Sequence, residues 1–461
     1  MNRVYWKPLA AVLAWFVVAT SIFAAEPPPA DAGWKAGAAS VVITPAEPMW
    51  MAGYASRNKP SEGKFQDLFA KALALQDAAG TRLVIVTCDL IGIPRALRDA
   101  VEKDVREKHK LPPECLLMNA SHTHSGPVVR VKSFYSLSEQ HEQQVDKYAA
   151  GLQQKLVTLA GQSLADLAPA RLGYCHARAG FAMNRRLPSK TGYQNSPNPD
   201  GPVDHDVPVL RVERADGKLR AVLFGYACHN TTLGLYQFCG DYAGFAQQYV
   251  EEAHPGVTAL FTIGCGADQN PYPRSTLEWA QRHGRSLADA VEAALLPQAR
   301  PIRGPLRAAF QEVSLAFAPA PSRDELVRMK EKGSQYEKRH AAKLLEELDK
   351  NGRIRPDYAY PVQVVRFGDD LILVALAGEV VVDYSLRLKR ELAGPAVWVA
   401  GYSNDVFGYV PSARVLKEGG YEASGAVLYS SLSGPFAPSV EERIAGKVHE
   451  LARTTQSKGS P

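Results

Sequence analysis

The sequence contains no Cys-x-x-C pair, no long run of basic residues and no repeat of fixed period. Its 6 cysteines are isolated, so nothing indicates a zinc site built from cysteines. Disulfide bridges and buried free thiols both remain open for them. The net charge of +5 is spread along the chain and gives no support to nucleic-acid binding. With 46% hydrophobic and 22% charged residues, the composition is globular.

Long hydrophobic runs are also missing after the N-terminus, so no later segment is predicted to cross a bilayer. The N-terminus itself has Arg3 and Lys7, then an apolar run from Leu9 to Phe23, then two alanines. This order is typical of a secretory signal. We therefore expect residues 1–25 to be a signal peptide and the protein to be exported, either to the periplasm or out of the cell. An uncleaved membrane anchor is the alternative.

Apolar runs and helical patterns alternate through the rest of the chain. An amphipathic pattern follows each of four runs, Thr81–Cys88, Cys115–Ser121, Arg220–Cys228 and Val257–Cys265. This alternation favours an α/β fold with buried strands. The Asp216-Gly217 turn adds a local hairpin, so we expect a mixed β-sheet core flanked by helices. A charged helical pattern over Arg323–Leu348 is interpreted as a solvated surface element.

The ends of the chain differ in composition from its centre. Residues 26–34 are rich in proline and are interpreted as a spacer, and residues 453–461 as a flexible tail. The expected organisation is therefore one large α/β domain over residues 35–452.

Polar residues follow several apolar runs, at the points where strands are expected to end. They are Asp89, His122, His124, His229, Asn230, Asp268, Asn270, Glu379, Asn404 and Asp405. One polar residue at a strand end is usually a turn former. In open α/β sheets, however, ligands bind at the carboxyl ends of strands. Several such residues together, with histidines and acids among them, predict a single site.

The pair His122 and His124 is the strongest part of this pattern. Side chains at i and i+2 of a strand point to one face, so both rings are expected in one pocket. Imidazole is both the commonest metal ligand and the commonest general base near neutral pH. Since cysteine clusters are missing, zinc held by His and carboxylate is expected, with His229 and Glu379 as partners of His122. For an isolated His-x-His, a solvent-exposed or hydrogen-bonded pair is the alternative.

Two well-known His-x-His patterns do not fit the sequence. Metallo-β-lactamase-like hydrolases need an aspartate two residues after the second histidine, where this chain has Gly126. Barrel amidohydrolases place the motif on their first strand, whereas here at least two strand signals precede it.

A third pattern does fit, because five motifs occur in order: SHTHSGP, GYACHN, GDYAGFA, LAGE and SNDVFGYV…GGYEAS. With these motifs the chain resembles the catalytic N-terminal domain of the neutral/alkaline non-lysosomal ceramidases. The resemblance extends from Lys35 to Tyr429, which is nearly the whole expected domain.

The resemblance implies a set of zinc ligands. The first histidine of the HTH element, the histidine of ACH and the glutamate of GE match His122, His229 and Glu379. Two tyrosines follow at a spacing of twelve, and the first, Tyr409, would complete the zinc shell. The second, Tyr421, would contact the substrate.

The resemblance also implies catalytic roles for two further residues. His124 would transfer protons or bind the carbonyl beside the metal, and Arg185, in the sequence AMNRRL, would contact the scissile amide. Asp89, Asp241 and Asp268 are interpreted as supporting or turn residues rather than ligands.

The sequence departs from the family pattern in two places. The family has a further C-terminal β-sandwich, which is not expected in this chain. The family's GDxSPN element appears as Gly266–Pro271 without a serine, so a serine-based chemistry is not supported.

Together these observations predict an exported, zinc-dependent amidohydrolase. It would cleave an N-acyl amide, in ceramide or a related lipid, by attack of zinc-bound water. Contact with a membrane surface is a further expectation, and the sequence does not indicate an oligomeric state. Two alternatives remain: a zinc hydrolase for a smaller amide or ester, and an inactive binding protein that has kept the pocket.

Overall fold

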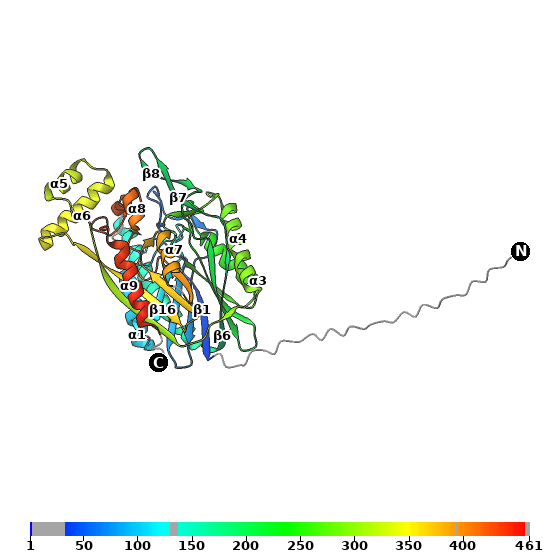
Figure 1. The fold of residues 1–461 in the computed structure, drawn as a ribbon. Coiled ribbons are helices and arrows are strands. Elements are labelled where there is room, and N and C mark those ends of the chain that lie inside the picture. Colours follow the sequence, from blue (N-terminus) through cyan, green and yellow to red (C-terminus); the bar gives the residue numbers. More distant parts are fainter. Residues whose placement is uncertain (2–32, 130–136, 393, 457–461) are drawn as a thin grey trace. The chain divides into compact units, whose positions relative to one another are not determined.

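The computed structural model describes residues 1, 33–129, 137–392 and 394–456 (Figure 1). The chain divides into residues 1–31 and 32–461, and all described helices and strands belong to the second unit. The predicted signal peptide and most of the spacer lie outside the described residues, as does the end of the predicted tail. Within the described ranges, no helix combines the length and the apolar character that a membrane span requires.

A nine-stranded mixed sheet forms the centre of the second unit. Two pairs, β10–β12 and β4–β5, are parallel, and the other pairs are antiparallel. The strand order is β12 (Thr258–Ile263), β10 (Leu219–Tyr226), β9 (Asp206–Arg214), β6 (Ala168–Arg178), β1 (Trp34–Val42), β3 (Phe69–Gln76), β4 (Arg82–Cys88) and β5 (Leu116–Ala120), with β14 (Arg300–Pro301) beside β6. The α/β fold with a mixed sheet is therefore confirmed.

A second sheet packs face to face against the first. It contains β15 (Leu306–Ala316), β16 (Asp357–Phe367), β17 (Leu371–Leu376) and β19 (Ala396–Ala400). Leu73, Ile85 and Leu223 of the first sheet share one apolar cluster with Phe367 and Trp398 of the second. Since successive residues of a strand point to opposite faces, Val84 and Val86 lie on the other side of the first sheet. Burial on both faces explains why the strand sequences are continuously apolar.

Helices cover the outer face of each sheet (Figure 1). On the first sheet they are α1 (Arg95–His109), α2 (Glu139–Ala165), α3 (Asp241–Ala253) and α4 (Leu277–Leu295). On the second sheet they are α7 (Val382–Glu391) and α9 (Val440–Thr454). The result is four layers, helix–sheet–sheet–helix.

The charged pattern over Arg323–Leu348 forms two helices, α5 (Arg323–Lys332) and α6 (Gln335–Asn351). The break lies at Gly333 and Ser334, where a second capping box starts a new helix. Their apolar faces form a small cluster of their own, and most of their other residues face solvent. Figure 1 shows both helices and α8 (Ala413–Glu418), and α6 packs against the segment Gly425–Tyr429.

All 6 cysteines are buried and free. The structure therefore resolves the open choice in favour of buried thiols, which pack as small apolar side chains.

Short strands form three small sheets of their own. They are β2 (Gly63–Lys64) with β11 (Gln237–Phe238), β13 (Gln269–Pro271) with β7 (Ala182–Ser189) and β8 (Gly192–Asn198), and β18 (Glu379–Val380) with β20 (Tyr409–Val410). The 3-10 helices are η1 (Pro113–Cys115) and η2 (Gly425–Tyr429).

Candidate functional site

Five predicted site residues come together from four parts of the chain. His122 and His124 follow β5, His229 follows β10, and Glu379 and Tyr409 begin β18 and β20. These last two strands pair in parallel, with Glu379 opposite Tyr409. The short ladder therefore places a carboxylate and a phenol side by side next to the histidines.

Three distances between these groups fit ligands that share one metal ion. Glu379 Oε2 lies 3.3 Å from His122 Nε2 and 3.3 Å from His229 Nε2. Tyr409 Oη lies 3.2 Å from His229 Nε2. With zinc bonds of about 2.0–2.1 Å, two ligand atoms of a tetrahedral site lie roughly 3.3 Å apart. The donor atoms are therefore spaced as they would be around one ion.

Backbone carbonyls determine which ring nitrogen of each histidine faces the site. His122 Nδ1 lies 2.6 Å from the Ile91 carbonyl oxygen, and His229 Nδ1 lies 2.8 Å from that of Gly266. Because a carbonyl only accepts, each Nδ1 must carry the proton and donate it. Both Nε2 atoms then present lone pairs toward Glu379, as in metal-binding histidines held by carbonyl groups.

This arrangement leaves an unmet need for positive charge. Glu379 Oε2 is buried and has no hydrogen-bond partner among the described residues. With both histidines protonated on Nδ1, no hydrogen lies between their Nε2 atoms and the carboxylate. A buried carboxylate oxygen that faces two lone pairs without a donor is costly, and a bound cation would satisfy it. The residues present therefore fit a metal ion.

Ionisation in the site also suits metal binding. Burial and the charge of Arg185 lower the pKa of His229 to about 3. Burial and His122 hold the pKa of His124 well below its usual value. Burial opposes the charge of Glu379, but His122 and His229 outweigh it and keep its pKa well below the ordinary range. Neutral imidazole and an ionised carboxylate are the forms that bind metal.

His124 completes a group of three histidines that could hold a metal ion. The coordinating nitrogens of His122, His124 and His229 lie within 4.8 Å of one another, and His124 Nε2 is 3.1 Å from His122 Nε2. His124 Nδ1 is buried without a partner among the described residues. The ring packs against Gly53, where a Cβ would lie 2.5 Å from it. Only glycine leaves room for the ring in this position.

The two rings meet for a different reason than the sequence predicts. Strand β5 ends at Ala120, so His122 and His124 are not on a strand, and the alternation argument was wrong. His122 has a φ of 59°, which is uncommon for a residue with a side chain. This left-handed turn directs both rings to the same point, and such strain is typical of functional sites.

Arg185 contacts the site by a hydrogen bond to Tyr409. Its Nη2 donates to Tyr409 Oη at 2.9 Å, and its Nε donates to Glu422 Oε1 at 2.9 Å. Glu422 Oε2 accepts from Arg186 Nη1 at 2.5 Å. All three charged side chains are buried. Arg185 therefore places a fixed positive charge beside Tyr409.

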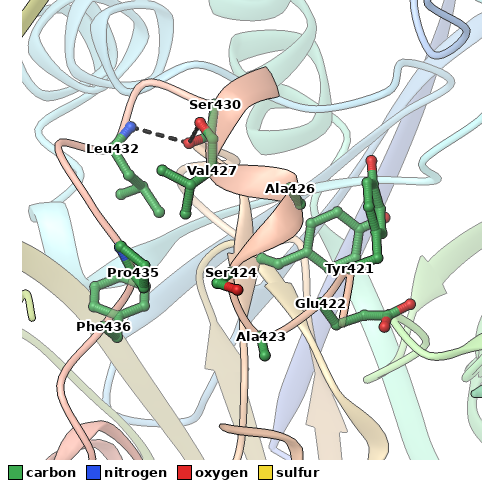
Figure 2. Close-up of a pocket in the computed structure, with 11 residues that line it drawn as sticks. Tyr421, Glu422, Ala423, Ser424, Ala426, Val427, Ser430, Leu432, Pro435 and Phe436 are labelled. Carbon is green, nitrogen blue, oxygen red and sulfur yellow. Dashed lines mark hydrogen bonds between the residues drawn. The ribbon is translucent and has the colours of Figure 1, made fainter. Parts of the chain in front are cut away.

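Tyr421 lies at the edge of the site, 39% exposed. Its ring centroid is 5.2 Å from that of Tyr409. Figure 2 shows Tyr421 and Glu422 beside the turn that carries Ser424 and Ala426, where a pocket of about 10 Å³ has room for about one water. Tyr421 is thus placed to meet a ligand that enters from solvent.

A large cavity opens onto Glu379. It offers about 460 Å³ to water-sized molecules, a volume typical of small-molecule sites. Much of its lining is apolar, from Ile91, Val128, Val129, Val406, Phe407 and Leu428. The remainder includes Tyr429 and residues of α6.

The three predicted supporting aspartates hold backbone groups. Asp89 accepts a hydrogen bond from Phe69 N. Asp241, the first residue of α3, accepts one from Leu233 N. Asp268 accepts from Val382 N at the start of α7, and burial raises its pKa to about 7. None of these carboxylates is within hydrogen-bond distance of His122, His124 or His229 among the contacts of the described residues.

Sequence reasoning missed two residues of the site. Glu422 was not singled out, although it directly follows Tyr421, because a buried ion pair leaves no signal in local periodicity. Tyr402 was also missed; it is buried, has a φ of 50°, and its ring lies 4.4 Å from that of His122.

Replacing Glu422 with glutamine is expected to destabilise the protein by about 3–5 kcal/mol at pH 7, because two buried guanidiniums lose their counter-charge. Burial opposes the charge of Glu422, but Arg185 and Arg186 outweigh it and hold its pKa below the ordinary value of a glutamate. Its stabilisation is therefore present above that value and is lost as pH falls through the folded-state pKa. Urea unfolding between pH 3 and pH 7, measured for both proteins, checks this.

Glu418→Gln is the matched control. Glu418 pairs with Arg186 at 3.1 Å but is partly exposed, so its loss should cost about 0–1 kcal/mol. Equal effects of the two substitutions would contradict the role given to Glu422.

The N-terminal part of the chain matches a known protein family. Residues 34–270 match the family model "Neutral/alkaline non-lysosomal ceramidase, N-terminal", which is more than half of the chain. No curated protein matches the sequence.

Two solved structures have a similar fold. The neutral ceramidase from Pseudomonas aeruginosa aligns with a TM-score of 0.72 and 20% identity, over 93% of this chain and 76% of that one. A second structure, described as a ceramidase complexed with C2, aligns with a TM-score of 0.71 and 20% identity, over 93% and 77%. At this identity the likeness shows the shared fold.

Proposed function

The chain belongs to the neutral/alkaline non-lysosomal ceramidase family, and on that premise we propose that it is a zinc-dependent hydrolase of an N-acyl amide bond, in ceramide or a related lipid. One observation supports zinc binding above all. The Nε2 lone pairs of His122 and His229 point at the Glu379 carboxylate, whose Oε2 is buried, with no proton between them. A lipid substrate is supported by the apolar cavity that reaches Glu379, and by a similar structure that is complexed with C2.

His122, His229, Glu379 and Tyr409 are the proposed metal ligands. Zinc bound there would supply a Lewis acid that makes water nucleophilic near neutral pH and polarises a carbonyl. The Ile91 and Gly266 carbonyls keep the two rings in the required tautomer. Arg185 stabilises negative charge on Tyr409, which a phenol must carry to bind a metal well.

His124 is the proposed proton-transfer group. Burial keeps its imidazole neutral, so its ring can take a proton from the attacking water. The same ring then gives that proton to the leaving amine nitrogen, which completes cleavage of the C–N bond. Its place beside His122, at 3.1 Å between the Nε2 atoms, supports this role.

Tyr421 and Arg185 are the proposed groups for the substrate carbonyl. Tyr421 is the more accessible of the two and has a hydroxyl that can donate to a developing oxyanion. Arg185 already donates to Tyr409, Glu422 and Asn270. It would therefore contribute mainly through its charge and through the position of Tyr409.

Metal content tests this proposal against an inactive binding protein. Purified mature protein is expected to carry about one zinc per chain, as one site of this ligand count implies. Removal of the metal by a chelator should abolish hydrolysis, and added zinc should restore it. Plasma emission spectrometry and activity on one sample are the measurements. Full activity without detectable metal would refute the zinc mechanism.

A substrate screen on the same sample separates the proposed reaction from its alternative. It compares an N-acyl sphingoid base, an N-acyl amino acid and a simple ester. Preference for the amides supports the proposal, whereas cleavage of the ester alone would favour the alternative, a hydrolase of a smaller ester.

Export is a separate proposal, supported by the charge pattern and apolar run of residues 1–25. Cleavage after the signal is measured by N-terminal sequencing of protein recovered from outside the cytoplasm.

A further inference from the structure

We propose that the cavity beside the metal site binds an N-acyl amide that carries an anionic group, held by Arg339 and Lys343 of α6. This inference rests on the proposed function and specifies its substrate class. It concerns the side of the cavity that α6 supplies.

The cavity has two chemically different parts. Ile91, Val128, Val129, Val406, Phe407 and Leu428 form an apolar surface that suits an acyl chain. Arg339, His340 and Lys343 of α6 also line it. Glu379 is the only carboxylate among the lining residues of the described part, and it faces the metal site.

The cationic side chains share one face of α6. Residues i and i+4 of a helix are neighbours on its surface, so Arg339 and Lys343 lie one above the other. The Arg339 guanidinium lies over the Tyr336 ring, 5.6 Å from its centroid. Lys343 Nζ donates to the Ser431 carbonyl at 2.7 Å, and Ser431 is itself part of the cavity wall.

Aromatic packing keeps α6 against the cavity. The rings of Tyr336 and Tyr429 are 4.7 Å apart, and Tyr429 is a lining residue. His340 is buried and its pKa is lowered to about 4, chiefly by burial, so it is neutral at pH 7. The positive charge of this wall therefore comes from Arg339 and Lys343.

An anionic group on the lipid would complement the two positive charges in this wall of the cavity, and a neutral lipid would not. A metal ion beside Glu379 would cancel its single negative charge, so the lining as a whole becomes positive. A carboxylate, sulfonate or phosphate accepts charge-assisted hydrogen bonds from both Arg and Lys. The group could belong to the amine part of the substrate or to the far end of its acyl chain.

Matched substrates test the charge directly. N-dodecanoylglycine and N-dodecanoylethanolamine differ in little but the carboxylate, and the ethanolamide of dodecanedioic acid places that carboxylate at the chain end. At least one anionic amide should have kcat/KM about tenfold or more above the neutral amide, as one charge-assisted hydrogen bond implies. Whichever anionic amide is preferred identifies where the charge lies.

Arg339→Ala and Lys343→Ala should each remove most of this preference, measured as the ratio of kcat/KM for the anionic amide to kcat/KM for the neutral amide in the same variant. Lys338→Ala is the matched control, because it removes the same charge from an exposed position of the same helix. It should preserve the preference. Equal kcat/KM for all three amides in the unmodified protein, or an unchanged preference in both cavity variants, would overturn the inference.

Binding without turnover separates this inference from the proposed function. Sulfonamide analogues of the glycine, ethanolamine and chain-end carboxylate compounds resist hydrolysis, and their Kd can be measured by calorimetry on the same purified protein. Suppose that no amide is cleaved, but that an anionic sulfonamide binds about tenfold tighter than the neutral one and loses this advantage in Arg339→Ala. Then the proposed amide hydrolysis is wrong and the anion site is supported. If the amides are cleaved but charge changes neither Kd nor kcat/KM, only this inference is wrong.

Discussion

Replacing His122 with alanine is expected to remove both zinc and activity, while replacing His124 is expected to remove activity alone. His122 has its Nδ1 proton held by the Ile91 carbonyl, so its Nε2 is available to bind the metal with Glu379 and His229. His124 has no carbonyl to orient it in this way, and its Nδ1 has no partner among the described residues. General acid–base help is worth about 10²–10⁴-fold, so kcat of His124→Ala should fall by that factor.

The measurements are zinc per chain and kcat on both variants. His176→Ala serves as the control, because His176 has a side chain 65% exposed and pairs with Asp206; it should change neither quantity. Equal loss of zinc from His122→Ala and His124→Ala would mean that all three histidines bind the metal. Retention of zinc and activity in both would make the pair structural and remove the main support for a zinc hydrolase.

Glu379→Gln is expected to reduce zinc affinity strongly while the fold is retained. Glutamine preserves the shape of the side chain but removes the charge on which the two Nε2 lone pairs converge. Loss of an outer contact to a ligand typically costs about 10–100-fold in metal affinity, and loss of a charged ligand should cost more. Competition with a chromophoric zinc chelator measures the affinity.

Circular dichroism and thermal unfolding of the metal-free proteins check the fold. Glu346→Gln, the same substitution at an exposed position of α6, should leave zinc affinity unchanged. Unchanged affinity in Glu379→Gln as well would exclude Glu379 as a ligand.

Much of the site could be predicted from residue types and their order along the chain. His122, His229 and Glu379 are acceptors that follow apolar runs. In the structure, Glu379 Oε2 lies 3.3 Å from the Nε2 atom of each histidine. Arg185 and Tyr421 followed from the family resemblance, and the structure places both beside Tyr409. Their catalytic roles remain predictions.

The reason for the convergence could not be predicted. The alternation argument placed His122 and His124 on a strand, but a φ of 59° at His122 brings the rings together. A left-handed residue with a side chain is locally unfavourable, so local preference predicts against it. Packing of the His122 ring against Tyr402, 280 positions along the chain by number (402 − 122), supports this conformation.

The buried ion pair and the cavity could likewise not be predicted from the sequence. Glu422 pairs with Arg185 across 237 positions of the chain, and a single sequence contains no signal for such a pair. The cavity that joins Glu379 to Arg339 and Lys343 also depends on how α6 packs against Tyr429.

The sequence by itself determined that its apolar runs form buried strands of an α/β fold, and which residue types follow those runs. Apolar runs such as Leu83–Val86 must be buried on both faces, and histidines with a carboxylate are suited to metal. Only the tertiary structure decided that a second sheet covers the first, that one ring nitrogen of each ligand histidine donates to a carbonyl, and that α6 supplies cations to the cavity. Periodicity reports the burial of a residue but not its partner, because partners are selected by packing between segments distant in the chain.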